Sequence, residues 1–251
     1  MSNTVNDARR ELPRATVNLR HRDTYVRYLR QSDAIVPKDD FIVELARGRR
    51  VLDLGCIDHS AETALALGDG WLHARIRSVA EELVGIDMLQ DDADILNARG
   101  YDIRIADVET LDLGDQFDLV VAGDLIEHLS NVGRFLEAVS HHMHDRAAFV
   151  VTTPNPFNAE QFCQAVFRNQ VMVNPQHTAW IDPHVMHELV SRSPFEIVDF
   201  RWIDTRFHFR LKGGRVVRRI VNPLVDRVMR RRPLLRRDYA VVLMLRDGAL
   251  R

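Results

Sequence analysis

Short apolar runs that end in a glycine or an acid alternate with stretches of helical periodicity along this chain. The first run, Val51–Leu54, is interrupted by Asp53 and closed by Gly55. Runs of this kind form strands that are buried on both faces of a parallel sheet. Alternation of such strands with helices predicts an α/β fold, a doubly wound, mostly parallel seven-stranded sheet with helices on both faces. The expected strands are 51–54, 83–87, 101–109, 117–124, 147–153, 195–203 and 239–245.

Acids stand at the carboxyl ends of the next expected strands, where open sheets of this type bind their ligands. Asp87 ends the second strand, the position from which an acid accepts hydrogen bonds from ribose hydroxyls. The gap from Asp53 to Asp87 exceeds the usual one of about 20 residues, which indicates an insertion around 58–71. The glycine fingerprint of dinucleotide-binding proteins is absent, since Gly55 is followed by CIDHS.

Length and composition bound the class of protein. A chain of 251 residues with 46% hydrophobic residues buries one good-sized α/β core. Its net charge of −2 gives no general attraction to nucleic acid or membrane, and its two cysteines are too few for a disulfide framework. No apolar run reaches the length of a membrane span, and residues 1–14 lack the apolar core of a signal peptide. We therefore expect a cytoplasmic protein.

The chain divides at about residue 40. We expect residues 1–40 to be an N-terminal tail followed by a helix at 20–30, in which Tyr25, Tyr28 and Leu29 fall at helical spacing. This helix either packs on the sheet or forms a lid over the ligand pocket, and we predict a lid. Residues 41–251 are expected to be a single domain with a basic insertion at 210–237, which holds eleven Lys or Arg and one acid.

The motifs VLDLGC, VGID, ADVE, FDLVVAGDLIEHL and FVVTTPNPF resemble, in order and spacing, those of class I S-adenosylmethionine-dependent methyltransferases. The resemblance covers about residues 20–204 and implies a sheet with one antiparallel strand near the C-terminus. It also implies that S-adenosylmethionine is the methyl donor. The chain departs from the family at Ile57–His59, where many members have a second glycine.

The same resemblance assigns residues to the donor. An acid and an apolar residue after the third strand, here Asp107 and Val108, accept from the adenine amino group and pack on its ring. The predicted donor-binding residues are Asp53, Gly55, Cys56, Asp87, Met88, Asp107, Val108 and Asp124.

A hydroxyl acceptor needs a base within hydrogen-bond reach, whereas the sulfonium methyl group is already activated. His128, just after the fourth strand, and His177, after the fifth, lie where the family places the acceptor. Histidine is suited to the role because its unperturbed pKa is about 6.5. We predict that His128 and His177 are catalytic, and that His141, His142 and His144 are solvated surface residues.

A metal site is the alternative role for these residues. Asp124, Glu127 and His128 are spaced to share one helical face, and His177 would complete a set of oxygen and nitrogen ligands. The arrangement looks like the Glu-x-x-Glu-His site of small-RNA 2′-O-methyltransferases, with Asp124 in place of a Glu. Since many methyltransferases carry E-H-L here without a metal, the sequence favours transfer without one.

Three functions remain open at this stage. We favour O-methylation of a small molecule or a sugar or glycan precursor. The alternatives are a metal-dependent RNA 2′-O-methyltransferase and a non-catalytic partner protein with this fold. The basic insertion 210–237 either packs on the core or contacts an anionic membrane surface, and nucleic acid is disfavoured because no aromatic residues are interleaved in it to stack bases.

Overall fold

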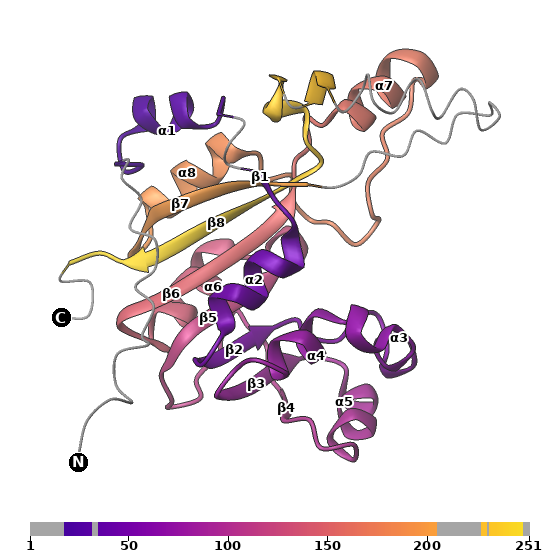
Figure 1. The fold of residues 1–251 in the computed structure, drawn as a ribbon, viewed down its shortest axis with the longest axis vertical. Coiled ribbons are helices and arrows are strands. Elements are labelled where there is room, and N and C mark those ends of the chain that lie inside the picture. Colours follow the sequence, from indigo (N-terminus) through magenta and orange to yellow (C-terminus); the bar gives the residue numbers. More distant parts are fainter. Residues whose placement is uncertain (1–17, 32–34, 205–226, 230, 248–251) are drawn as a thin grey trace, which may run out of the picture.

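Eight strands form one sheet in the order β1-β7-β8-β6-β5-β2-β3-β4 (Figure 1). The computed structural model describes residues 18–31, 35–204, 227–229 and 231–247, and statements about the structure refer to these residues. The strands are β1 (Ile35–Val36), β2 (Arg50–Leu54), β3 (Glu82–Asp87), β4 (Ile103–Ile105), β5 (Phe117–Gly123), β6 (Met143–Pro154), β7 (Phe195–Ile203) and β8 (Asp238–Leu245).

The sheet is mostly parallel, as predicted. Only β8 runs against its neighbours, pairing antiparallel with both β6 and β7. The seven expected strands are all present, and the eighth is β1, which pairs parallel with the end of β7 through Ile35 and Val36. Two residues are too short to show the periodicity from which a strand is predicted.

Helices cover both faces of the sheet, and in Figure 1 α2 and α6 lie on opposite sides of β5 and β6. The run Leu119–Ala122 of β5 is apolar because it is buried on both faces of the sheet. Val120 and Ala122 pack in the cluster that includes α1, α6 and α8, whereas Leu119 and Val121 pack with α2 and α4. The helices are α1 (Arg22–Tyr28), α2 (Lys38–Ala46), α3 (Ala61–Leu67), α4 (Leu72–Arg77), α5 (Gln90–Asn97), α6 (Val132–Ser140), α7 (Ala159–Arg168) and α8 (Pro183–Ser191).

The N-terminal helix α1 packs on the sheet. Tyr25 is fully buried, donates its hydroxyl to the carbonyl of Pro183 at 2.9 Å, and meets Phe200 edge to face. Trp202 donates its indole N–H to the carbonyl of Leu29. Among the residues that the structure describes, no member of α1 lines the large cleft described below. The packed alternative therefore fits this helix, and the structure offers no support for a lid.

Gly85 in β3 is a point of close approach between the sheet and the segments above it. A Cβ added there would lie 2.6 Å from Cys56 Sγ, 2.9 Å from His73 Cε1 and 3.1 Å from Ile103 Cγ1. All three neighbours are buried. A larger residue therefore has no space to enter without moving the loop after β2.

Gly85→Ala is expected to lower the free energy of unfolding by about 1–3 kcal/mol, the usual effect of overpacking a core. Urea denaturation followed by circular dichroism measures it. Gly133→Ala is the matched control, because its Cβ would meet Asn131 Oδ1 at an ordinary 3.5 Å on α6. Equal stability of Gly85→Ala and the wild type would show that the loop after β2 does not press on this strand.

The basic insertion predicted at 210–237 lies largely outside the described residues. Of its described part, Arg236 is buried and pairs with Asp204 at 2.7 Å. The predicted membrane contact of this segment therefore stays a prediction. In the described part of the chain, no helix has the length and apolar character needed to cross a bilayer.

Candidate functional site

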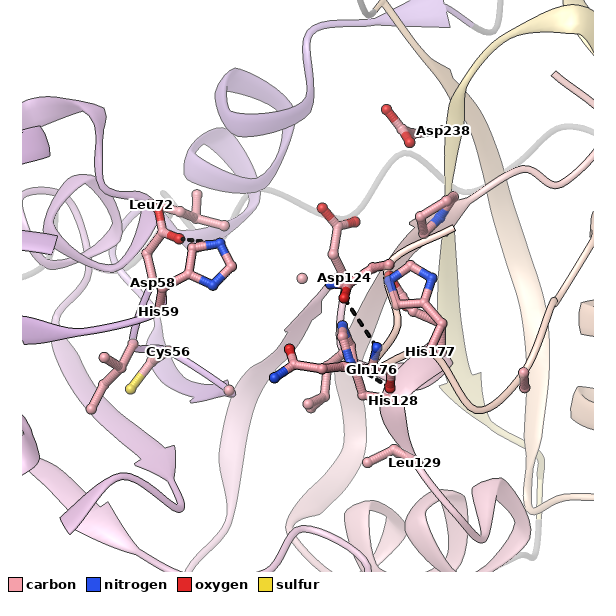
Figure 2. Close-up of a pocket in the computed structure, with 18 of the residues that line it drawn as sticks. Cys56, Asp58, His59, Leu72, Asp124, His128, Leu129, Gln176, His177 and Asp238 are labelled. Atoms are coloured by element: carbon pink, nitrogen blue, oxygen red, sulfur yellow. Dashed lines mark hydrogen bonds and ion pairs between the residues drawn. The ribbon is translucent and has the colours of Figure 1, made fainter. Parts of the chain in front are cut away.

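A cleft of about 1500 Å³ opens at the carboxyl ends of β2, β3, β5 and β6. Ligand pockets for one small molecule are usually about 300–1,000 Å³, so this cleft has room for two ligands side by side. In Figure 2, Cys56, His59 and Leu72 form one wall, and Asp124 and His177 stand on the other. All the predicted donor-binding and catalytic residues line this one cleft.

The loop after β2 turns at two residues with left-handed backbone. Gly55 has φ 68° and donates its N–H to the carbonyl of Ile86 at 2.8 Å. His59 has φ 59°, a conformation that costs most side chains about 1–2 kcal/mol. Ser60 then caps α3 by accepting from the N–H of Thr63. The segment Ile57–His59 thus makes its turn without the second glycine of related sequences.

Asp87 fastens this loop to the end of β3. One carboxylate oxygen accepts from the N–H of Ile57 at 2.9 Å, and the other accepts from the N–H groups of Met88 and Leu89. An ionised carboxylate has about four lone-pair sites, so a site is left for a ligand hydroxyl. The structure thus shows a loop-anchoring role for Asp87, and its ribose contact stays a prediction.

The residues predicted to hold the adenine follow β4. Asp107 is exposed, and its carboxylate accepts from the N–H of Glu109 at 2.9 Å. Val108 is buried, and Met88 is 70% exposed; both line the cleft. Apolar side chains can pack on an adenine ring, and an exposed carboxylate beside them can accept from the adenine amino group.

Beneath the loop, Asp53 is buried and meets His73 Nδ1 at 2.8 Å. Cys56 is also buried, and its carbonyl accepts from the indole N–H of Trp71. Burial, followed by the charges of Asp53 and Asp87, raises the pKa of the Cys56 thiol well above its ordinary value. The thiol therefore stays protonated and packs in the wall of the cleft.

Asp124, at the end of β5, pairs with Lys38 from the start of α2. Its backbone has φ 51°, and its carboxylate accepts from the hydroxyl of Thr152 at 2.8 Å. Burial lowers the pKa of Lys38, but the adjacent charge of Asp124 outweighs this and the net shift is upward. The predicted helical face shared by Asp124, Glu127 and His128 is wrong, because the left-handed backbone at Asp124 prevents a helix from beginning there.

Glu127 lies in the short 3₁₀ turn Ile126–His128 and is 2% exposed. Its Oε2 accepts from the hydroxyl of Thr153 at 2.9 Å, whereas Oε1 is buried without a hydrogen-bond partner. Burial, together with the charge of Asp124, raises the pKa of Glu127 to about 7. The environment of Glu127, which lines the cleft, therefore disfavours the ionised form of its carboxyl group.

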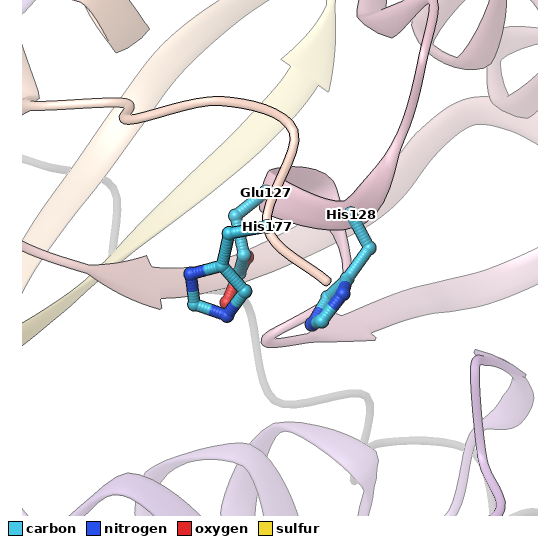
Figure 3. A group of neighbouring side chains, drawn as sticks. All are labelled: Glu127, His128 and His177. Carbon is cyan, nitrogen blue, oxygen red and sulfur yellow. The ribbon is translucent and has the colours of Figure 1, made fainter. Parts of the chain in front are cut away.

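His128 and His177 meet Glu127 from two segments (Figure 3). The two imidazole rings stand edge to face with centroids 4.7 Å apart. His128 donates its Nδ1–H to the carbonyl of Gln176 at 3.2 Å, which leaves Nε2 free as an acceptor. Burial and then the neighbouring His128 lower the pKa of His177, which favours its neutral form.

The loop that carries His177 is tied to the turn that carries Glu127. The carbonyl of Glu127 accepts from the N–H of Thr178 at 2.9 Å, from the N–H of Ala179 and from the hydroxyl of Thr178. These bonds place the predicted catalytic histidines together, although 48 residues separate His128 from Gln176.

Sequence reasoning missed Lys38, His73, Thr152 and Thr153. His73 had a usable signal, since it lies three residues before Ile76 on the buried face of α4. Lys38 had none, because its partner Asp124 is 86 residues away. The prediction that His142 is a solvated residue is wrong: it is 1% exposed, and its ring bonds to the carbonyl of Ala138 and the N–H of Leu113.

The cleft is strongly acidic. Among the described residues that line it, ten are carboxylates, and Lys38 and Arg237 are the lysine and arginine present. Low-dielectric walls of one charge sign focus the electrostatic potential and attract ligands of the opposite sign. The carboxylates are Asp39, Asp53, Asp58, Asp87, Asp107, Glu109, Asp124, Glu127, Glu160 and Asp238.

Comparison with known proteins finds a match over residues 24–199 to the family described as "Methyltransferase domain". A ubiquinone biosynthesis O-methyltransferase of Azorhizobium caulinodans is 30% identical over 117 residues, covering 43% of this chain and 42% of that protein. A probable S-adenosylmethionine-dependent methyltransferase of Mycolicibacterium smegmatis is 28% identical over 157 residues, covering 61% and 54%. The chain thus spans about half the length of the curated relatives it matches.

Solved structures show the same fold. A S-adenosylmethionine-dependent methyltransferase of Mesorhizobium loti superposes with a TM-score of 0.53 at 16% identity, over 82% of this chain and 95% of that one. An O-methyltransferase of a trans-AT PKS multienzyme of Brevibacillus brevis, in complex with S-adenosyl-L-homocysteine, gives 0.51 at 13% identity, over 83% and 72%. At these identities the likeness concerns the fold, which is that of the class I methyltransferases.

Proposed function

This chain belongs to the methyltransferase-domain family, and from that membership we propose that it transfers the methyl group of S-adenosylmethionine to a hydroxyl of a small organic acceptor. One observation carries the proposal: one acidic cleft is lined both by the predicted donor-binding residues and by the cluster of Glu127, His128 and His177. When bound, S-adenosylmethionine supplies an activated methyl group on a positively charged sulfonium.

The predicted donor-binding residues suit S-adenosylmethionine. Asp87 and Asp107 present carboxylate oxygens at the ends of β3 and β4, where ribose and adenine are held in sheets of this type. Gly55 lines the cleft and turns the backbone there with φ 68°, a conformation that glycine adopts readily. The excess of carboxylates favours a cationic donor over an anionic one.

His128 and His177 suit an acceptor that carries a hydroxyl group. A hydroxyl must lose its proton as it reacts, and groups that assist such a transfer must lie within hydrogen-bond reach. His128 turns Nε2 outward because its Nδ1–H is held by Gln176, and His177 is biased toward the neutral form that accepts a proton. We assign to His128 and His177 the task of acting on the acceptor hydroxyl.

Apolar side chains at the rim of the cleft favour an acceptor with an apolar part over a sugar. Val171, Met172, Val173 and Trp180 line the cleft and are each between 42% and 59% exposed. Removing apolar surface from water contributes about 25 cal/mol of favourable free energy for each Å² that a ligand covers. Two of the matched relatives, named for O-methylation in ubiquinone biosynthesis and in a polyketide multienzyme, are consistent with this class.

RNA is the weaker candidate acceptor. Protein surfaces that bind nucleic acid neutralise phosphates with lysine and arginine, whereas carboxylates dominate this cleft. The third alternative is a partner protein without activity, which the missing second glycine at Ile57–His59 had suggested. The loop completes its turn without that glycine and is anchored by Asp87, so this alternative has little support.

Incubation of the full chain with methyl-labelled S-adenosylmethionine and a panel of acceptors tests the proposal. The panel holds phenols and alcohols with apolar substituents, free sugars, amines and a short single-stranded RNA. We expect label in a methyl ether of an apolar hydroxyl compound. Transfer to RNA alone or to amines alone would overturn the assignment of the acceptor class.

A further inference from the structure

Glu127, His128 and His177 offer three ligand atoms, one oxygen and two nitrogens, that all lie within 4.8 Å of one another. In Figure 3 their functional groups converge on one point of the cleft. We infer that these three residues form a site for a divalent transition-metal ion of the zinc type. The inference rests on the proposed function in one respect, that the ion would act on the hydroxyl of the acceptor.

The carboxylate supplies the first argument. Glu127 is 2% exposed, and the hydroxyl of Thr153 satisfies only its Oε2. Its Oε1 is buried and has no hydrogen-bond partner. A buried polar atom without a partner destabilises the folded protein, and the cost is larger when the atom is charged. A cation at the meeting point of the three side chains removes this cost, whereas a site built only for a histidine base leaves it unexplained.

The imidazoles supply the second argument. A metal-binding histidine usually donates its other ring N–H to a carbonyl or carboxylate, which orients the ring toward the ion. His128 makes such a bond, from Nδ1–H to the carbonyl of Gln176. Thr153 holds the carboxylate of Glu127 in the same way. Two of the three ligands therefore have the outer partners that a metal site requires.

The ligand set favours a transition-metal ion over magnesium. Two imidazoles and one carboxylate form one of the ligand sets of catalytic zinc sites, which keep a further position open. Around a tetrahedral ion with bonds of 2.0–2.1 Å the ligand atoms are about 3.3 Å apart. Small side-chain rotations would bring the three ligand atoms, which now lie within 4.8 Å of one another, to this separation. Magnesium is disfavoured because it prefers oxygen ligands.

Asp124 is not one of the three residues whose ligand atoms lie within 4.8 Å of one another. Its carboxylate pairs instead with Lys38 and with the hydroxyl of Thr152. The open position would then be available to the hydroxyl oxygen of the acceptor, whose acidity a bound cation increases.

Metal titration of the chelator-treated full chain tests the site without any assay of activity. Calorimetry with zinc chloride is expected to show one equivalent bound per chain. Glu127→Gln, His128→Ala and His177→Ala should each weaken zinc binding by more than about 100-fold, since loss of an outer partner alone costs 10–100-fold. Cobalt should bind at the same site with a visible absorption band, and magnesium should bind far more weakly.

His141→Ala is the control, because His141 is exposed at the C-terminal end of α6, away from the cleft. Its loss tests for unspecific binding by surface histidines. It should bind zinc like the wild type. A wild type that binds no zinc, or three ligand variants that bind it unchanged, would overturn the site.

Binding of S-adenosylmethionine by the same samples shows that the variants are folded and separates the two proposals. Donor binding and methyl transfer by a zinc-free wild type would refute the action of the ion on the acceptor hydroxyl and would support the proposed function. Zinc binding at the three residues without transfer to any hydroxyl acceptor would refute the proposed function alone.

Discussion

Replacement of His128 by alanine is expected to lower turnover by about 10²–10⁴-fold while the affinity for S-adenosylmethionine stays unchanged. The size is that of a positioned group which assists proton transfer, and loss of a metal ligand has an effect of several kcal/mol on the transition state. Donor affinity should be spared because His128 is not among the predicted donor-binding residues, and Cys56, which is one of them, lies on the opposite wall of the cleft. Steady-state kinetics with an accepted substrate measures kcat and KM separately.

The kinetics also separate the two ways in which His128 could act. If a bound cation acts on the hydroxyl, a chelator should abolish the activity of the wild type, and Glu127→Gln and His177→Ala should reproduce the loss. If His128 acts directly as a base, a chelator should have no effect, whereas His128→Ala should still lose turnover. His144→Ala is the control, since His144 pairs with Asp118 outside the cleft. Full turnover by a folded His128→Ala variant would remove His128 from the mechanism.

Replacement of Asp87 by alanine is expected to weaken binding of S-adenosylmethionine at least roughly tenfold. Hydrogen bonds to charged groups contribute about 1.5–3 kcal/mol each, and the carboxylate is predicted to accept from the ribose hydroxyls. The variant also removes the acceptor of the Ile57 N–H, so the loop after β2 loses its anchor. Calorimetric titration with the donor measures the effect.

Asp91→Ala is the matched control for this prediction. Asp91 is an exposed acid in the first turn of α5, only four residues along the chain, and it does not line the cleft. Its removal changes the net charge by the same amount as Asp87→Ala and should leave the affinity unchanged. If both variants lose affinity equally, general electrostatic attraction explains the effect. If neither loses it, the assignment of β3 to ribose binding is wrong.

The strands and the ligand edge of the sheet could be predicted because they depend on local patterns. Each of the seven expected strands is an apolar run, and residues such as Asp87 and Asp124 follow from the rule that ligands lie beyond the carboxyl ends of parallel strands. The convergence of His128 and His177 was likewise predictable from the positions of β5 and β6.

Contacts between distant segments escaped prediction. The pairing of Lys38 with Asp124 depends on how α2 approaches the end of β5, and no periodicity records that approach. Asp124 also shows how a local rule can mislead. Its spacing to Glu127 and His128 fits a helix, but the hydroxyl of Thr152, which follows from the pairing of β5 with β6, holds Asp124 in a left-handed conformation.

The place of α1 escaped prediction for a related reason. Amphipathic spacing shows that Tyr25 and Leu29 are buried but not which surface buries them. The surface is that of α8 and β7, where Tyr25 bonds to Pro183 and Leu29 receives the indole of Trp202.

Calorimetric titration of the wild-type chain with S-adenosylmethionine tests the central claim, that the acidic cleft is a donor site. The account predicts one equivalent bound per chain, displacement by S-adenosylhomocysteine, and loss of affinity in Asp87→Ala but not in Asp91→Ala. A folded wild-type chain that binds neither compound at millimolar concentration would contradict it.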